Sequence, residues 1–394
     1  MRAKSLDDHL KGAGPKRVLS LDGGGVRGVV AIAFLERIES VLRDRFEDDL
    51  KARFGAEYEF RLCDYFDMIG GTSTGAIIAA GVATGRTVAD LKQLYFSLAK
   101  KIFKKPGLLG FTRIGIVRPK FDHDTLRDIL RQEFDGITME SDEIKTGLAI
   151  FMKNATTNSP WIITNTPDRK HWKGAVLGEG TIPMNHYKLF EAVSGSTAAP
   201  YYFHPQNIQI SEGGEENAFV DGGLTPFNNP TLGLLDLVTL NAYGINWTKG
   251  IDQLLMISIG TGQFGHVRKE PRWWENASAI AAINNLRGLI EDIELLTLRR
   301  SMLLANCHTR WDLDRDLEDL ATEPQGQDMT MARYNIVLGP TWIAKNTSST
   351  LSNEEVWALF DMTNVGGMET CYAIAQEVAE HQVKPNHFDD VFNL

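Results

Sequence analysis

Residues 71–75 read Gly-Thr-Ser-Thr-Gly, and the apolar run Tyr65-Phe66-Asp67-Met68-Ile69 precedes them. The apolar run predicts a buried strand, and the small residues after it predict a sharp turn into a helix. A serine at such a turn has its hydroxyl exposed, which is how a fold presents a nucleophilic oxygen. The flanking glycines allow strand and helix to pass closely, where a Cβ atom would collide. Small residues cluster in many tight turns, so the motif alone fits a buried structural serine as well as a nucleophile.

A glycine-rich loop lies upstream, between a predicted strand at residues 17–21 and a predicted helix from Val29. Its sequence is Asp22-Gly23-Gly24-Gly25-Val26-Arg27-Gly28. Free N–H groups at the start of a helix attract negative charge, which suits an oxyanion hole. The loop also matches the Gly-x-Gly-x-x-Gly pattern of dinucleotide-binding proteins, but that motif needs an acidic residue at the end of the next strand. The acidic residues in range fall on a helical or charged segment instead (Glu39, Glu47, Asp48 and Asp49), so the oxyanion hole is favoured.

A third motif, Asp221-Gly222-Gly223, ends a predicted strand at residues 218–220. Residues 224–230 then lead into a predicted helix that starts near Thr231. An aspartate before two glycines is common in turns, so this motif means little by itself. It gains weight because it follows the glycine loop and the serine turn in the same chain.

The three motifs in this order resemble the patatin-like phospholipase family. Further similarity lies in Asn228-Asn229-Pro230 and in residues 66–70, 192–200 and 257–262, so that the resemblance extends from about residue 16 to 265. One departure is Gly195, where family members often carry serine. The C-terminal third resembles the family more weakly.

The resemblance implies a lipid acyl hydrolase with a Ser–Asp dyad and with neither metal nor cofactor. Ser73 would form an acyl-enzyme, and Asp221 would be the general base. The N–H groups of Gly23, Gly24 and Gly25 would form the oxyanion hole. The remaining motif residues would support this site: Asp22, Arg27, Gly28, Gly71, Gly75, Gly222 and Gly223. Two roles are open for Arg27: it either adds positive charge to the site or forms a structural ion pair, and the ion pair is slightly favoured.

Two alternatives concern the base and the substrate. In an α/β-hydrolase triad the histidine follows the serine, which makes His204, His266 and His308 eligible by chain order. The enzyme could instead be a serine esterase or thioesterase for small acyl substrates. A non-catalytic storage or binding protein that keeps the fold is a further alternative, and the intact Ser73, Asp221 and three glycines argue against it.

The composition is ordinary for a globular protein: 394 residues, of which 43% are apolar and 23% charged. The resemblance favours a single domain over 1–394, with a motif-bearing core at 16–232 and one remaining sheet strand plus helices at 233–394. The net charge of −10 argues against nucleic acid as a partner. The scattered Cys63, Cys307 and Cys371 predict neither a disulfide framework nor a zinc site, and they suit a reducing compartment.

Alternation of strands and helices predicts an α/β fold, with a mostly parallel central sheet covered by helices on both faces. Strands are expected at 18–21, 66–70, 146–152, 161–165, 218–220 and 254–259. Helices are expected at 29–50, 88–103, 124–134 and 275–305, and two more within 353–380. Residues 68–85 carry no charge and are long enough to span a membrane, but their small residues suit a buried helix behind the serine turn.

Residues 1–17 lack the apolar core of an export signal, which predicts a cytoplasmic protein. Peripheral membrane contact is expected through residues 100–120, where cations alternate with apolar side chains and no acid occurs (Lys100, Lys101, Lys104, Lys105, Arg113, Arg118 and Lys120). An inward-packed, solvated loop fits this segment equally well. Trp273 and Trp274 are a weaker candidate for such contact. The resemblance to bacterial family members also raises activation by a nucleotide messenger through the helical C-terminal third, although no residue indicates it.

Overall fold

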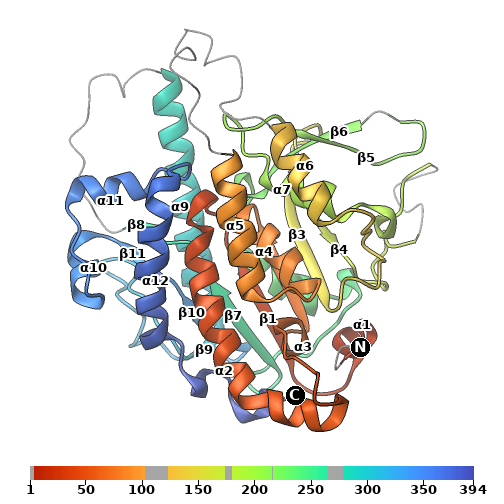
Figure 1. The fold of residues 1–394 in the computed structure, drawn as a ribbon, viewed down its shortest axis with the longest axis horizontal. Coiled ribbons are helices and arrows are strands. Elements are labelled where there is room, and N and C mark those ends of the chain that lie inside the picture. The colour runs from red at the N-terminus through yellow and green to blue at the C-terminus, as the bar shows by residue number, and fades with distance from the viewer. Residues whose placement is uncertain (1–3, 103–122, 174–179, 215, 265–277) are drawn as a thin grey trace.

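The protein is described by a computed structural model that covers residues 4–102, 123–173, 180–214, 216–264 and 278–394 (Figure 1). One sheet runs through the molecule, with its strands in the order β5, β6, β3, β2, β1, β7, β10 and β9, and with β4 paired to β3. Their bounds are β1 (Lys16–Leu21), β2 (Met68–Thr72), β3 (Gly147–Asn154), β4 (Ser159–Thr164), β5 (Gln206–Gln209), β6 (Glu216–Asp221), β7 (Leu254–Ile259), β9 (Ala305–Cys307) and β10 (Met329–Tyr334).

The strands from β3 across to β9 are parallel to one another. The antiparallel pairs gather at the other edge, where β4 and β6 both run against β3 and β5 runs against β6. The mostly parallel sheet predicted from the sequence is therefore confirmed. The two strands expected near 146–152 and 161–165 form an antiparallel pair.

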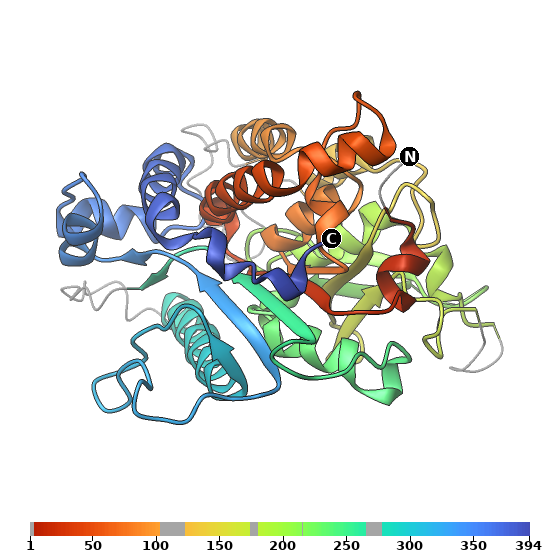
Figure 2. The same ribbon diagram turned by 90° about the horizontal axis from the view of Figure 1, so that it is seen from below.

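Helices cover both faces of the sheet, as predicted. One face carries α2 (Gly28–Phe54), α4 (Thr74–Ala83), α5 (Val88–Ile102), α6 (His123–Glu133), α7 (Leu189–Thr197) and α12 (Met368–Gln382), and the other carries α8 (Thr231–Thr239) and α9 (Ser278–Leu304). Figure 2 shows these layers edge-on, with the red α2 and the blue α12 on one side of the strands and the teal α9 on the other. Shorter helices flank them: α1 (Leu6–Lys11), α3 (Leu62–Tyr65), α10 (Pro340–Asn346) and α11 (Asn353–Leu359).

The strand sequences explain the two layers, because successive side chains of a strand point to opposite faces. Leu19 and Leu21 of β1 lie in the core under α2, whereas Val18 lies in the second core with Leu234 of α8. All six residues of β1 are buried. This burial on both faces is why the apolar residues of β1, Val18, Leu19 and Leu21, do not alternate strictly with polar ones.

The region after residue 233 departs from the prediction of one further sheet strand. It contributes three strands, β7, β9 and β10, and a separate two-stranded sheet of β8 (Gln263–Phe264) and β11 (Val337–Leu338). The sequence gives little sign of β9, which has three residues, or of β10, whose Met-Thr-Met-Ala-Arg-Tyr includes a charged Arg333. Arg333 is tolerated in a buried strand because it pairs with a buried carboxylate described below.

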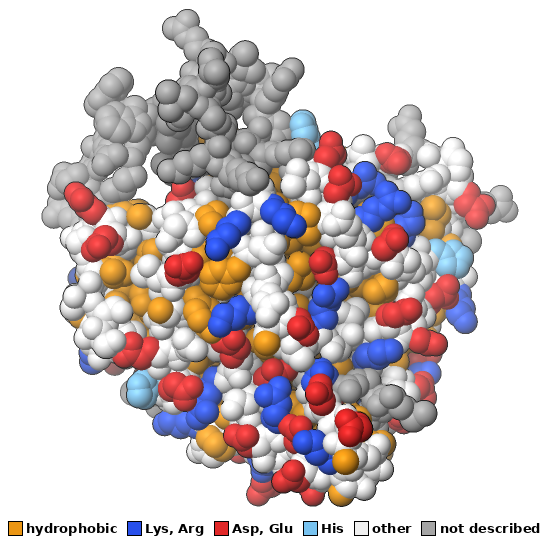
Figure 3. All heavy atoms as spheres, in the orientation of Figure 1, with side chains coloured by type: hydrophobic (Ala, Val, Ile, Leu, Met, Phe, Trp, Pro, Cys, Tyr) orange, Lys and Arg blue, Asp and Glu red, His pale blue; other side chains and the backbone are white. Residues whose placement is uncertain are grey.

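The uncharged stretch at residues 68–85 forms β2, the serine turn and α4; the strand and the helix are buried within the fold, and Ser73 is half-buried. Across the described residues, no helix combines the length and the apolar character needed to cross a bilayer. Of the basic segment at 100–120, Lys100 and Lys101 end α5, and residues 103–120 lie outside the described residues, as do Trp273 and Trp274. Figure 3 shows acidic and basic side chains interspersed over the face that carries α2, α5 and α12.

Glycine allows the serine turn to cross the end of β1 at van der Waals distance. A Cβ atom at Gly75 would lie 2.8 Å from the carbonyl oxygen of Asp22 and closer still to that of Leu21. A Cβ atom at Gly71 would lie 2.7 Å from the backbone nitrogen of Ala76. Real Cβ atoms do not approach backbone this closely, so these two glycines fix how α4 packs on the sheet.

We expect Gly75→Ala to lower the free energy of unfolding by about 1–3 kcal/mol, because the added methyl group meets backbone that cannot move aside. The matched control is Gly288→Ala on α9, where a Cβ atom would meet nothing within 4 Å. Alanine should stabilise that half-buried helical position by about 0.5–1 kcal/mol. Urea unfolding of both variants measures the difference, and a Gly75→Ala protein as stable as the wild type would contradict the close crossing.

Candidate active site

Ser73 lies between β2 and α4 with backbone angles φ 54° and ψ −122°. A positive φ is uncommon for a residue with a Cβ atom and marks a strained turn. In this conformation the Ser73 hydroxyl donates a hydrogen bond to Oδ2 of Asp221 at 2.6 Å. The structure thus brings together the two residues that the sequence singled out 148 positions apart.

Strand pairing explains how Asp221 reaches Ser73. Thr72, at the end of β2, pairs with Phe151 of β3, and Asp221, at the end of β6, pairs with the next residue, Met152. Because β6 runs antiparallel to β3, it ends at the same level of the sheet at which β2 ends. The two side chains therefore meet across the carboxyl end of β3.

The Asp221 carboxylate is buried without a paired cation among the described residues, and its side chain is 7% exposed. Its Oδ1 atom accepts a hydrogen bond from the Gly223 N–H at 2.7 Å. Burial raises the pKa of Asp221 to about 6, although the hydrogen bonds from Ser73 and Gly223 act in the opposite direction. A carboxylate with a raised pKa beside a hydroxyl has the geometry and proton affinity of a general base.

Ser196, at the end of α7, holds the backbone of the turn. Its hydroxyl accepts a hydrogen bond from the Ser73 N–H at 2.9 Å and donates to the carbonyl oxygen of Phe151 at 2.6 Å. Ser196 lies in the small-residue segment 192–200, whose one distinctive feature in the sequence is its family resemblance. Nothing in the local sequence indicates that this serine contacts the nucleophile.

The glycine loop lies beside Ser73, since a Cβ atom at Gly23 would be 3.3 Å from Cβ of Ser73. The Gly23 N–H donates to the carbonyl oxygen of Asn228 at 3.0 Å, so it is not free for an oxyanion, contrary to the prediction. Within the described part of the chain, no acceptor is found for the N–H groups of Gly24 and Gly25. The N–H group of the next residue, Val26, has an acceptor, since it donates to the carbonyl oxygen of Met362.

Asp22 anchors the start of the loop through a buried ion pair with Arg333 of β10. Oδ1 and Oδ2 of Asp22 lie 3.0 and 2.5 Å from the two terminal nitrogens of the guanidinium group. Both residues are buried, and Arg333 also donates to the Ser258 hydroxyl. Two parallel bonds fix orientation as well as distance, so the pair holds the end of β1 against β7 and β10.

The other predicted motif glycines are sites of close packing. A Cβ atom at Gly28 would collide with Thr74 and lie 2.8 Å from the Tyr95 hydroxyl oxygen. At Gly222 it would collide with the carbonyl of Phe151, and at Gly223 it would lie 3.1 Å from Oδ1 of Asp221. These contacts support the dyad sterically.

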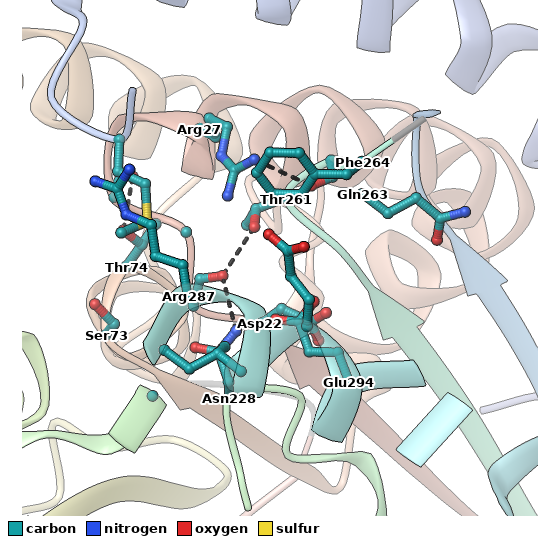
Figure 4. A pocket seen from close by; sticks show the side chains of 18 of the residues that line it. Asp22, Arg27, Ser73, Thr74, Asn228, Thr261, Gln263, Phe264, Arg287 and Glu294 are labelled. Atoms are coloured by element: carbon teal, nitrogen blue, oxygen red, sulfur yellow. Dashed lines mark hydrogen bonds between the residues drawn. The ribbon is translucent and has the colours of Figure 1, made fainter. Parts of the chain in front are cut away.

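Arg27 differs from its predicted role. Among the described residues it forms no ion pair within 4 Å; its guanidinium lies 5.5 Å from the Phe264 ring centre and donates to the Gly262 carbonyl oxygen at 3.3 Å. Its Nε atom is buried without a hydrogen-bond partner in the described structure. Figure 4 shows the side chain reaching into the cavity, so Arg27 supplies positive charge there.

A cavity of about 1350 Å³ opens in front of Ser73 and is lined by Asp221, Gly23, Gly24, Gly25 and Arg27. One wall is apolar and comes from α4, α5 and α6 (Ile77, Leu98, Ala99, Ile102 and Leu126). Figure 4 shows Asn228 between Ser73 and Glu294 of α9. Glu294 accepts a hydrogen bond from Nδ2 of Asn228, and burial raises its pKa to about 7. No sequence pattern predicts this second carboxyl in the cavity.

No histidine lines the cavity in the described structure. His308 pairs with Asp389 at 3.0 Å, His204 is exposed, and His266 lies outside the described residues. Among the described residues, no three His, Cys, Asp or Glu side chains gather where they could hold a metal ion. The geometry therefore favours Asp221 over the two described histidines as the base for Ser73.

Comparison with known proteins agrees with these motifs. Residues 19–235 match the patatin-like phospholipase family. A cGAMP-activated phospholipase of Escherichia coli (strain TW11681) is 31% identical over 221 residues, which cover 56% of this chain and 55% of that protein. Patatin-15 of Solanum tuberosum is 30% identical over 260 residues, which cover 62% of this chain and 60% of patatin-15. The chain thus matches little more than half the length of each relative.

Two solved structures overlap more loosely. VipD from Legionella pneumophila gives a TM-score of 0.33 at 13% identity and covers 92% of this chain and 67% of VipD. Human GIVD cytosolic phospholipase A2 gives a TM-score of 0.43 at 8% identity and covers 98% of this chain and 61% of that protein. The family assignment rests on the sequence match.

Replacing Asp221 by Asn should raise the free energy of unfolding at pH 8. Burial raises the native pKa from 3.8 to about 6, so the native state binds more protons than the unfolded chain between these values, and stability falls as the pH rises through them. At about 1.4 kcal/mol per pKa unit, Asn should gain on the order of 2–3 kcal/mol at pH 8 and almost nothing at pH 4.

Urea unfolding at pH 4, 6 and 8 measures this effect. The matched control is Asp22→Asn, which leaves Arg333 buried without its partner and should destabilise the protein at pH 8 by about 3–5 kcal/mol. An Asp221→Asn variant less stable than the wild type at pH 8 would show that the Asp221 carboxylate is stabilised rather than penalised by its site.

Proposed function

The chain belongs to the patatin-like phospholipase family, and on this premise we propose that it is a lipid acyl hydrolase that cleaves carboxylic esters through an acyl-enzyme on Ser73. The observation that carries the proposal is the 2.6 Å hydrogen bond from the Ser73 hydroxyl to the buried Asp221 carboxylate, at the edge of a cavity large enough for an acyl chain.

In the first half of the reaction, Asp221 takes the proton of Ser73 as the serine oxygen attacks the ester carbonyl carbon. Negative charge moves to the carbonyl oxygen, where the free N–H groups of Gly24 and Gly25 are available to bind it. The intermediate collapses to the acyl-enzyme, and Asp221 returns the proton to the departing alcohol. In the second half, Asp221 takes a proton from water as the water oxygen attacks the acyl carbon. The bond to the Ser73 oxygen then breaks, Asp221 returns the proton to that oxygen, and the fatty acid is released.

The apolar wall of the cavity supports an acyl lipid as the substrate. Ile77 and Leu98 are apolar residues of that wall, which would take the acyl chain out of water. Arg27 and Arg287 lie in the same cavity and place positive charge where the polar part of a lipid would lie. The names of the relatives also point to phospholipids, and for this chain that substrate class is part of the proposal.

Hydrolysis of small esters or thioesters and activation by a nucleotide stay predictions. A small-ester or thioester hydrolase would use the same dyad, and the size of the cavity favours the larger substrate. One relative is named for activation by cGAMP, but no observation on the described residues identifies a nucleotide site here.

Ser73→Ala and Asp221→Ala should each lower ester hydrolysis by at least about 10³-fold, because one lacks the nucleophile and the other its base. Product analysis on mixed phospholipid vesicles and on a soluble p-nitrophenyl ester measures both activities. Loss on both substrates is expected. Retained turnover in Asp221→Ala would return the histidine alternative, and turnover of the soluble ester alone by the wild type would favour the small-ester enzyme.

The rate should depend on the ionisation of Asp221. Only the carboxylate can accept the serine proton, so kcat/KM should fall about tenfold per pH unit below the pKa of about 6 and reach a plateau above it. Glu294→Gln is the control, because it removes a cavity carboxyl whose pKa burial raises to about 7, close to that of Asp221. A profile whose midpoint near 6 moves or disappears in Glu294→Gln would assign the titration to Glu294 instead.

A further inference from the structure

The peptide unit between Gly23 and Gly24 has unusual freedom, because neither residue carries a Cβ atom. Gly24 has φ −178° and ψ 12°, and Gly25 has a φ of 58°. Glycine residues can rotate a peptide unit between two orientations at little steric cost. An oxyanion donor, however, must have its N–H fixed before the reaction begins. Something other than the loop's own sequence must therefore hold this peptide.

Thr261 contacts the peptide unit between Gly23 and Gly24 directly. It follows β7, its side chain is 5% exposed, and its hydroxyl donates a hydrogen bond to the carbonyl oxygen of Gly23 at 2.8 Å. The amide of Asn228 makes a longer contact of 3.5 Å with the same oxygen. Thr261 also packs against the loop, since a Cβ atom at Gly24 would collide with its side chain.

The consequence follows from the geometry of a trans peptide, in which the carbonyl oxygen and the amide hydrogen point in opposite directions. Holding the Gly23 oxygen toward Thr261 directs the Gly24 N–H away from Thr261. Figure 4 shows Thr261 and Ser73 on different sides of the cavity, and Gly23 itself abuts Ser73. The Gly24 N–H, for which the described structure offers no acceptor, is thereby held in one orientation, away from Thr261.

Thr261 is itself rigidly placed. The Gly260 N–H donates to the carbonyl oxygen of Tyr334 at 2.9 Å, and the Gly262 N–H donates to Oδ1 of Asn335 at 2.8 Å. Both partners belong to the segment at and after β10, outside the residues that match the family. Because the Thr261 hydroxyl is held in place, it can fix the orientation of the glycine peptide to which it is bonded.

From these contacts we propose that Thr261 is a positioning residue that orients the Gly24 N–H as an oxyanion donor. The proposal rests on the proposed function, because it assumes that negative charge develops beside Ser73. Thr261 hydrogen-bonds to the loop and not to Ser73 or Asp221, so its effect should appear in the transition state more than in substrate binding.

The test compares Thr261→Val, which removes the hydroxyl and keeps the shape, with Thr261→Ser, which keeps the hydroxyl. Loss of one oxyanion donor typically costs about 10²–10³-fold in kcat, and a donor that is misoriented only part of the time should cost about 10–100-fold. We expect that loss in Thr261→Val on a soluble p-nitrophenyl ester, with KM within about twofold, and near-wild-type kcat in Thr261→Ser. Thr261→Ala, as a second variant without the hydroxyl, should show the same loss if Thr261→Val folds poorly.

A second readout separates orientation from general damage. An acyl trifluoromethyl ketone forms a tetrahedral adduct with the serine and places an oxyanion in the hole, whereas the matching secondary alcohol binds without reacting. Affinity for the ketone should fall in Thr261→Val in parallel with kcat, and affinity for the alcohol should not change. Equal ketone affinity in the wild type and Thr261→Val would overturn the role of Thr261. A wild-type protein that forms no adduct on Ser73 would instead overturn the proposed function.

Discussion

The site depends on three backbone contacts that are closer than a side chain on the glycine would allow. Gly75 of the serine turn lies against the end of β1, Gly71 lies against the first turn of α4, and Gly222 lies against the end of β3. These contacts leave no room for a Cβ atom, so the spacing of the strands, the turn and the loop is fixed by backbone alone. The serine, the aspartate and the glycine loop can meet because the backbone at these contacts carries no Cβ atoms.

The buried aspartates differ in whether a cation partners them, and this difference distinguishes the structural aspartates from the proposed base. Asp22 is paired with Arg333, and Asp67 lies between Arg17 and His9. Burial acts to raise the pKa of Asp67, but the hydrogen bond from His9 and the charges of Arg17 and Lys4 outweigh it and hold the pKa below its usual value. Asp221 has hydrogen bonds but no paired cation among the described residues, so its pKa rises to about 6. Of these three acids, Asp221 is the one that lacks a cation partner among the described residues and contacts the Ser73 hydroxyl.

The sequence predicted the sheet, its helical cover and the meeting of Ser73 with Asp221, because these follow from apolar runs and from glycine-flanked turns that local rules describe. It did not predict Ser196, Arg333 or Thr261, whose contacts join segments far apart in the chain and leave no periodic signal. Arg27 was expected in an ion pair and lies on an aromatic ring in the cavity instead. The strand β10 was missed because a buried arginine reads as an exposed residue until its partner is known.

The central claim is that Asp221 activates the oxygen of Ser73. The most direct measurement is the rate of covalent labelling by a fluorophosphonate, with the modified peptide identified by mass spectrometry, in the wild type and in Asp221→Asn at pH 8. We expect the label to reside on Ser73 and labelling to be slower by orders of magnitude in the variant. A label on another residue, or equal rates on Ser73 in both proteins, would contradict it.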